Sequence, residues 1–243
     1  MDVTRLRRLL REVDEEHRDT LRTVTDDMAA AAHAASRRTF LRGSLAAGGA
    51  AALVLGPLAA SASAADAGTT TTAPPKTPQA GDLTLLGFAQ SLELAAVGVY
   101  DAALATGKLT DVPKLLAAAF KRHHTEHAEA IGGLAGKGAP GAANPGLLKL
   151  FADKVSAAKT ENDVLGVAFE LENAAAATYA YALGSIVGTN PASLVASIQP
   201  IEARHAVVLG EALNLTLKDF VPAFEPNAVG YGALDPAKYP ATG

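Results

Sequence analysis

The sequence after residue 81 repeats itself at a constant offset, and this repeat limits the fold more than any other feature. Glu93 begins the run ELAAVGVYDAAL, and Glu172, 79 positions later, begins ENAAAATYAYAL. His127 opens HAEAIGG, and His205, 78 positions later, opens HAVVLGE. Because the two offsets agree to within one residue, the sequence predicts a helical hairpin written twice, with a Glu on the first helix of each copy and a His on the second.

The composition of the 243-residue chain favours a single all-α domain. It is 49% hydrophobic and only 5% aromatic, and its many alanines with few β-branched runs favour helix over sheet. There is no cysteine, so any metal must be held by carboxylate oxygen and imidazole nitrogen. Residues 65–243 hold 12 Lys and Arg against 17 Asp and Glu, with the basic residues scattered singly, which excludes a nucleic-acid surface.

The first 64 residues have the features of an export signal with a long leader. Residues 36–41, SRRTFL, resemble the twin-arginine export motif, and an apolar Gly- and Ala-rich run follows at 45–60. Residues 62–64, ASA, have the small-x-small form of a cleavage site. We therefore expect recognition by the twin-arginine export machinery and a periplasmic, cell-wall-associated or secreted protein. Gly56-Pro57 interrupts the apolar run, so we expect no stable membrane span after cleavage, the alternative being an uncleaved anchor.

Residues 1–35 precede the arginine pair and form an unusually long leader. Leu6, Leu9, Leu10 and Val13 fall at helical spacing among charged residues, which predicts a short amphipathic helix. We interpret this leader as a solvated segment with no role in the mature protein.

The rest of the chain divides into a linker, a bundle and a tail. Residues 65–81 are rich in Thr and Pro and predict an extended linker. Residues 82–216 predict a four-helix bundle, with helices at 82–105, 111–134, 160–186 and 190–215. Residues 217–243 are Pro-rich and predict an irregular tail that packs against the bundle.

Local signals mark where these helices begin. Asp111 and Asn190 are expected to cap the second and fourth helices, each with a proline in the first turn. Thr160 with Asp163 resembles a capping box for the third. Pro200 lies inside the fourth helix, where we expect a kink or a break.

Acidic and imidazole side chains converge on the predicted core. The histidines of residues 65–243 all fall on the second helix of a hairpin: His123, His124, His127 and His205. Glu202 and His205 share a helical face, as do His124 and His127. Glu93 and Glu172 lie in apolar sequence, where an unpaired charge is costly. A metal ion is the partner that this pattern favours. The alternative is an empty polar core in which the glutamates bind the histidines by hydrogen bonds.

The order of these residues resembles the ferritin-like superfamily of carboxylate-bridged di-iron and di-manganese bundles, and more narrowly the exported, twin-arginine-dependent ferritin-like proteins of bacteria. The resemblance covers residues 82–215. It implies one Glu from each first helix and Glu-x-x-His from each second helix as metal ligands. Five residues match: Glu93, His127, Glu172, Glu202 and His205.

His124 departs from this pattern, because the family would have a Glu there. That Glu bridges two metals with its two oxygens, whereas a neutral imidazole offers one lone pair. The replacement also removes a negative charge, so the sequence leaves a dinuclear, an asymmetric and a mononuclear site open. Glu126 offers the reversed spacing His123-x-x-Glu126 as compensation, provided that the helix is rotated.

The sequence therefore predicts an exported metal-binding protein with iron, or manganese or zinc, at Glu93, His124, His127, Glu172, Glu202 and His205. Oxidation of the metal, peroxide removal and simple metal holding are the roles considered. The alternative is an exported structural or binding module that has lost the di-metal centre.

Tyr100 follows Glu93 by seven residues, and Tyr179 follows Glu172 by seven. We interpret both as core tyrosines with hydrogen-bonded hydroxyls. The oligomeric state is not set by the sequence.

Overall fold

The computed structural model describes residues 2–47, 75–216 and 232–241, and in the first of these ranges it describes side chains up to residue 30. Within these ranges it contains six α-helices, a short 3-10 helix and no strand, which confirms the all-α fold. The predicted cleavage site, nearly all of the apolar run before it, and most of the linker and tail lie outside the described residues.

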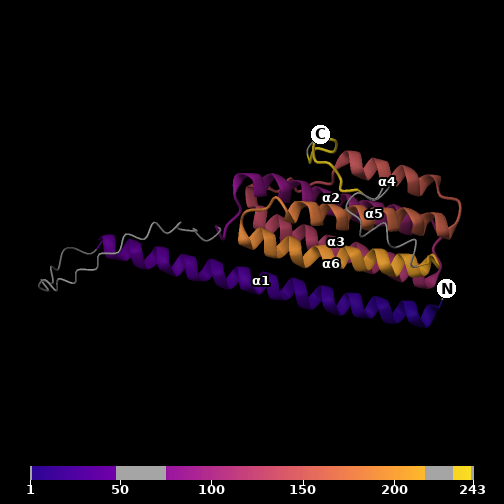
Figure 1. Cartoon of the computed structure of the whole chain (residues 1–243), viewed down its shortest axis with the longest axis horizontal. Helices are drawn as coiled ribbons and strands as arrows, with labels where there is room; N and C mark the ends of the chain where they lie inside the picture. The colour runs from indigo at the N-terminus through magenta and orange to yellow at the C-terminus, as the bar shows by residue number, and fades with distance from the viewer. Residues whose placement is uncertain (1, 48–74, 217–231, 242–243) are drawn as a thin grey trace, which may run out of the picture.

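Four helices form the bundle that the repeat predicts. α2 (Ala80–Ala105) packs along α3 (Asp111–Ala135), and α5 (Glu161–Leu183) packs along α6 (Thr189–Ala212). α4 (Pro145–Ala157) lies in the crossover between the two hairpins and packs on α2 at the outer edge of the bundle (Figure 1). The two hairpins are therefore the two copies of the sequence repeat.

The helix starts follow local side-chain chemistry, with two corrections to the predicted caps. The Thr160 hydroxyl accepts from the Asp163 N–H and the Asp163 carboxylate accepts from the Thr160 N–H, which is the capping box expected for α5. At α3, Thr110 and not Asp111 occupies the cap position, because the helix starts at Asp111 itself.

α6 starts one residue before the predicted cap. Gly188 is its cap residue, so the prediction of Asn190 was wrong. The N–H groups of Thr189 and Asn190 donate to the carbonyls of Pro75 and Lys76 at 2.9 and 3.0 Å. Because the chain before α2 already satisfies these donors, α6 needs no capping side chain. The last residues of the predicted linker are therefore part of the folded unit.

α6 is continuous through Pro200, so the helix is not broken there. It ends at Ala212, three residues earlier than predicted. Asn214 adopts φ 58°, a left-handed conformation that commonly follows a helix C-terminus. α5 likewise ends at Leu183, three residues before its predicted end.

Apolar side chains close the bundle on both sides of a polar layer. One buried cluster includes Phe120, Phe169 and Leu209, and a second, toward the other end of the helices, includes Ile131 and Leu194. Along α2, α3 and α5, the acidic and imidazole residues of the predicted site fall between these two clusters, and along α6 they fall between Ile201 and Ala206 of the first cluster. The polar layer is thus shielded from water along the bundle axis.

The N-terminal helix α1 (Val3–Ala47) packs against α6 and α3, which corrects the interpretation of residues 1–35 as a solvated leader. Leu6, Val13 and His17 are 2%, 3% and 0% exposed. The reason is an apolar stripe longer than the sequence analysis recognised. It continues at three- and four-residue steps through Leu21 and beyond, with His17 at one of its positions.

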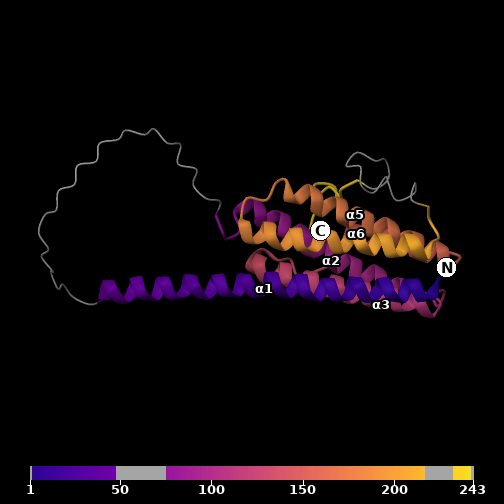
Figure 2. The same ribbon diagram turned by 60° about the horizontal axis from the view of Figure 1, so that its bottom comes forward.

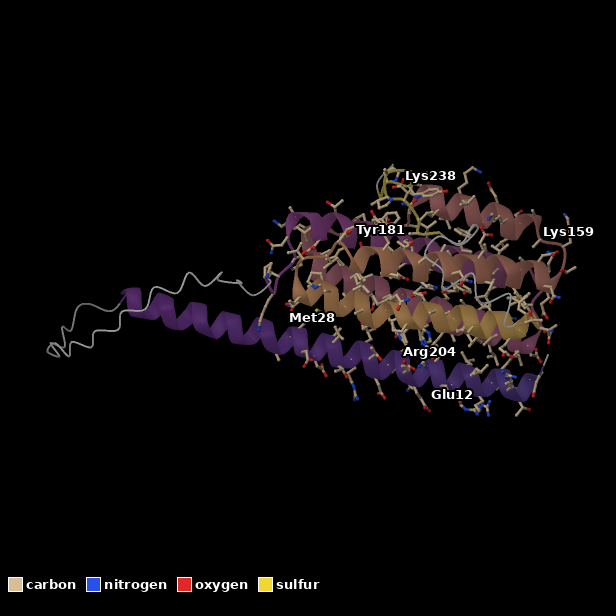
Figure 3. The ribbon with its side chains drawn as sticks, viewed as in Figure 1. Glu12, Met28, Lys159, Tyr181, Arg204 and Lys238 are labelled. Carbon is tan, nitrogen blue, oxygen red and sulfur yellow. The ribbon has the colours of Figure 1, made fainter. Side chains whose placement is uncertain are left out.

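Three ion pairs flank this stripe and fix the register of α1. Arg5 pairs with Glu211, and Asp14 and Glu16 pair with basic residues of α3 and α6, Arg122 and Arg204 respectively. Figure 2 shows α1 lying along the bundle, with its C-terminal part continuing past the bundle's end. In Figure 3, Arg204 lies between α6 and α1, Met28 is on the bundle side of α1, and Glu12 points away from it.

α2 is long and apolar enough, by length and composition, to cross a membrane. Most of that stretch is buried inside the bundle, as expected for a core helix.

The described part of the tail packs on α2, because Leu234 and Tyr239 contact the cluster of Phe88 and Leu92. The Asn144 side chain donates to the carbonyl oxygen of Tyr239 at 2.9 Å.

Asp82 connects the two hairpins at one end of the bundle. It is 1% exposed and accepts the N–H groups of Gln79, Val187 and Gly188 at 2.8, 2.8 and 2.9 Å. Burial by itself would raise the pKa of Asp82, but the three N–H groups outweigh it and hold the pKa below its usual value.

We predict that Asp82→Asn lowers the free energy of unfolding by roughly 1–3 kcal/mol at pH 7, because the amide replaces a charged acceptor of three N–H groups. A carboxyl group with a lowered folded-state pKa stabilises the fold above its unfolded pKa and loses this effect as the pH falls through the folded value. The difference from the unaltered protein should therefore shrink below about pH 4. Urea unfolding at pH 7 and pH 3 measures it. Asp153→Asn, on an exposed side chain, is the matched control.

Candidate metal centre

All six predicted ligands meet in the polar layer of the bundle. Their side chains are 0–1% exposed and come from four helices. α2 supplies Glu93, α5 supplies Glu172, and the pairs on α3 and α6 are spaced three residues apart: His124 with His127, and Glu202 with His205. The helical hairpin written twice therefore brings equivalent residues to one point from two sides.

The six residues form two overlapping sets of four. In the Glu93 set (Glu93, His124, His127 and Glu202), one ligand atom from each residue lies within 4.8 Å of every other. The same is true of the Glu172 set (His124, Glu172, Glu202 and His205). Each set has two carboxyl groups and two imidazoles, and a metal ion bound by either set would have only oxygen and nitrogen ligands.

Glu202 reaches both sets with its two oxygens. Oε1 lies 2.8 Å from Nδ1 of His127, in the Glu93 set. Oε2 lies 3.5 Å from Nδ1 of His205, in the Glu172 set. None of Glu202 Oε1, Glu202 Oε2 and His127 Nδ1 has a hydrogen bond of acceptable geometry, although all three are buried. Unpaired buried polar atoms of this kind are rare in proteins and call for a bound partner.

The sequence model of the ferritin-like domain family matches residues 81–215, more than half of the chain. The chain belongs to the ferritin-like domain family. No curated protein and no solved structure matches the chain. The match begins at the second residue of α2 and ends just after α6, so the family's domain is the four-helix bundle with α4, and α1 lies outside it.

His124 occupies the position that distinguishes this chain from the ferritin-like pattern. Its Nδ1 lies 2.6 Å from Glu93 and its Nε2 lies 3.1 Å from Glu172. The ring thus stands between the two sets, with one nitrogen directed at each. Residue 124 is three residues before His127, as Glu202 is three residues before His205, so His124 is the repeat-related counterpart of Glu202. His124 therefore lies between the two sets, as Glu202 does, but it carries an imidazole where Glu202 carries a carboxylate.

Carboxylates and imidazoles in this layer shift each other's pKa values. Burial by itself would raise the pKa of Glu93, but His124 and His127 outweigh it and lower that pKa to about 2. Burial would likewise lower the pKa of His127, but the adjacent carboxylates of Glu202 and Glu93 raise it to about 9. The pKa of His124 is raised well above its usual value, because three nearby glutamates outweigh the effect of burial. A metal ion at these nitrogens must displace protons.

The two core tyrosines cross-link the repeats. Tyr179, on α5, donates its hydroxyl to Glu93 on α2, and Tyr100, on α2, donates to Glu172 on α5. Each tyrosine therefore serves the glutamate of the other copy, and the interpretation as core tyrosines with hydrogen-bonded hydroxyls agrees with this contact. Burial, with the nearby glutamate, raises the pKa of both hydroxyls well above the usual value, so both remain protonated donors.

Sequence reasoning missed an outer layer that comes from α1. Asp14 accepts a hydrogen bond from Nε2 of His123 at 2.8 Å, and Nδ1 of His123 lies 2.9 Å from Nε2 of His205. Burial, with neighbouring cationic groups, lowers the pKa of His123, so its ring is neutral and can accept from His205. In metal sites, a hydrogen-bond partner on the ring nitrogen that does not bind the metal orients the histidine. His123 is such a partner for His205.

His17 is the second member of this outer layer. Its ring stacks on His127, with centroids 4.8 Å apart and planes 6° apart, and lies 4.0 Å from the ring of His123. Burial lowers its pKa to about 3. The signal in the sequence is a histidine at a position of the apolar stripe of residues 6–28.

Glu126 does not compensate for His124 through the reversed spacing. Its carboxylate lies 3.2 Å from His17 and 3.6 Å from Arg122, on the α1 side of α3 and away from the two sets. The helix is therefore oriented as the family pattern requires, with His124 and His127 facing inward.

We predict that Tyr179→Phe lowers the free energy of unfolding by roughly 1–3 kcal/mol, because a buried carboxylate oxygen of Glu93 loses its donor. Tyr100→Phe should have a similar effect through Glu172, given the symmetry of the contacts. Tyr181→Phe is the control, since Tyr181 is 63% exposed. Urea unfolding of the three variants measures the difference. Equal stability of Tyr179→Phe and Tyr181→Phe would contradict the assignment.

Proposed function

We propose that this protein is an exported ferritin-like protein that binds transition-metal ions, iron first, in the polar layer of its bundle. The observation that carries the proposal is the group of three buried atoms without hydrogen bonds, the two oxygens of Glu202 and Nδ1 of His127. Glu202, on α6, belongs to both ligand sets, and His127, on the facing helix α3, belongs to the Glu93 set. A cation between them satisfies all three and offsets their burial.

The donor set restricts the identity of the ion. Carboxylate and imidazole ligands without thiolate suit iron and manganese, and they also accept zinc. Three glutamates in one layer favour a cation that prefers oxygen ligands, which supports iron or manganese over softer metals. Bound iron would supply redox chemistry, either oxidation of the metal itself or removal of peroxide, and the protein would otherwise hold the metal.

The number of ions depends on His124. Glu202 can serve two ions at once, with one oxygen for each set. His124 can do so only if both ring nitrogens lose their protons, because a neutral imidazole has a single free lone pair. One ion in either set requires no such change. We therefore propose that the first ion binds readily and that His124 limits binding of the second.

A second candidate is an exported structural or binding module without metal. One observation favours it: His124 makes close contacts with both Glu93 and Glu172, and a protonated ring would hold these carboxylates together without a cation. Both candidates keep the proposal of export, which residues 36–41 and 62–64 support through their resemblance to a twin-arginine signal.

We predict that the protein purified from iron-replete cells contains one or two iron ions per chain, and that Glu202→Gln weakens iron binding by more than the roughly 10–100-fold typical of losing an outer hydrogen-bond partner of a ligand. Anaerobic titration with Fe²⁺ and elemental analysis measure both quantities. Glu129→Gln, on the exposed face of α3, is the control. Metal-free protein after growth with iron, manganese and zinc would contradict metal binding and support the structural module.

We also predict that His124→Glu increases the affinity for a second ion. A carboxylate has an oxygen for each set and adds negative charge, so it removes the requirement to deprotonate an imidazole twice. The same Fe²⁺ titration should then show two sites of closer affinity than in the unaltered protein. If His124→Glu leaves the stoichiometry and both affinities unchanged, His124 does not limit the second ion.

A further inference from the structure

α1 is an addition to the bundle and not a part of it. The two hairpins supply all six candidate ligands, and the family match excludes α1. Its main contacts are with α6 and α3, the two helices that carry the Glu-or-His-x-x-His pairs. α1 therefore lies over the side of the bundle from which four of the six ligands come.

His17 stands directly over the candidate centre. It is 0% exposed and stacks on His127, and neither of its nitrogens has a hydrogen bond of acceptable geometry. Its nearest charged neighbour is Glu126, 3.2 Å from Nε2. An apolar residue would fill this stripe position without leaving buried polar atoms unpaired. A helix that only stabilised the bundle would gain from such a residue, so His17 indicates that α1 is adapted to the polar layer beneath it.

The charged contacts across the interface also centre on this point. Asp14 faces Arg122 and His123, and Glu16 faces Arg204. Through His123, Asp14 reaches the far nitrogen of His205. Because these contacts sit beside His17 on the same helix, docking of α1 covers His127 and supports His205 in one step.

The connection of α1 to the bundle makes this cover removable. The candidate cleavage site at residues 62–64 lies between α1 and α2 in the sequence, so cleavage there would separate α1 from the rest of the chain. The four helices that remain hold every residue of the two sets. Removing the export signal would therefore remove the cover without removing a ligand.

We propose that α1 is a removable cover over the candidate metal centre, which slows exchange of the ion while it is docked and opens the α3–α6 side when it leaves with the export signal. This proposal rests on the proposed metal binding. Export then has a consequence beyond transport, since the ion taken up before cleavage is retained under α1 and becomes exchangeable afterwards.

The test compares the release of Fe²⁺ from the full chain with α1 locked, free and undocked. The chain has no cysteine, so Glu16→Cys with Arg204→Cys gives one specific pair for a short bis-maleimide cross-link. Val13→Asp places a charge in the buried stripe and should undock α1, and Val3→Asp is its match at a position 41% exposed on the same helix. Hydrogen exchange of residues 3–30 reports whether α1 is docked.

We expect Val13→Asp to release Fe²⁺ to a chelator at least about tenfold faster than Val3→Asp, because a buried charge shifts docking by more than one factor of ten. The cross-linked pair should release it more slowly than the same variant without cross-linker. If Fe²⁺ is released at the same rate from docked and undocked forms, or from cross-linked and uncross-linked forms, the proposal that α1 covers the centre is wrong.

A second arm serves if Val13→Asp stays docked or does not fold. A protease recognition sequence in place of residues 66–72 allows the folded chain to be cut where the signal would be removed. We expect the N-terminal fragment to separate from the bundle on gel filtration and release of Fe²⁺ to accelerate. A fragment that stays bound, or unchanged release after it leaves, contradicts the proposal. If the uncut chain binds no Fe²⁺, metal binding itself has failed, and the cover proposal fails with it.

Discussion

The burial of three carboxyl groups among imidazoles in one layer is the constraint on which the rest of this structure depends. Glu93, Glu172 and Glu202 are 0% exposed, and each would be strongly destabilising there alone. All four bundle helices contribute, because Glu93 accepts from side chains of α3 and α5, and Glu202 of α6 lies 2.8 Å from His127 of α3. The register of the four helices is therefore set by polar pairing at the middle, while the apolar clusters on either side supply most of the burial.

The two copies of the hairpin satisfy this constraint through each other. Tyr100 and Tyr179 donate to glutamates of the opposite copy, and His124 lies between the glutamates of both. A single hairpin would leave its own glutamate without its tyrosine donor. The two copies of the hairpin thus form one site together and not one site each. Such a site requires equivalent residues at matching positions of the two copies, which agrees with the nearly equal offsets between the repeats.

The repeat was sufficient to predict the four helices and the six inward residues, because helical spacing determines which side chains share a face. It could not predict that Tyr179 would bind Glu93 and not Glu172, since that depends on how the hairpins pack. The caps were missed at Asp111 and Asn190 for two reasons. At α3 a neighbouring Thr competes for the same position, and at α6 the partners of the first N–H groups are Pro75 and Lys76, which are distant in sequence.

The docking of α1 on the bundle was not predicted. Residues 36–41 resemble an export motif, and an export signal is expected to lie apart from the mature fold. The pattern of residues 1–35 was nevertheless informative, since Leu6, Val13 and Leu21 continue at spacings that keep one face apolar. A stripe of that length needs an apolar surface to cover it, and α3 and α6 supply that surface.

If the polar layer binds metal as proposed, His124 sets the order of folding and binding. With a glutamate at residue 124, the layer would hold four carboxyl groups against two imidazoles, and a cation would be needed to bring them together. With His124 it holds three of each, and the raised pKa values of His124 and His127 favour imidazolium rings beside the carboxyl groups. Such a layer does not require a cation in order to form, and under the proposed function each ion would displace protons from it. Metal loading would then be a step separate from folding, which is the condition under which a helix lying over the finished site could control it.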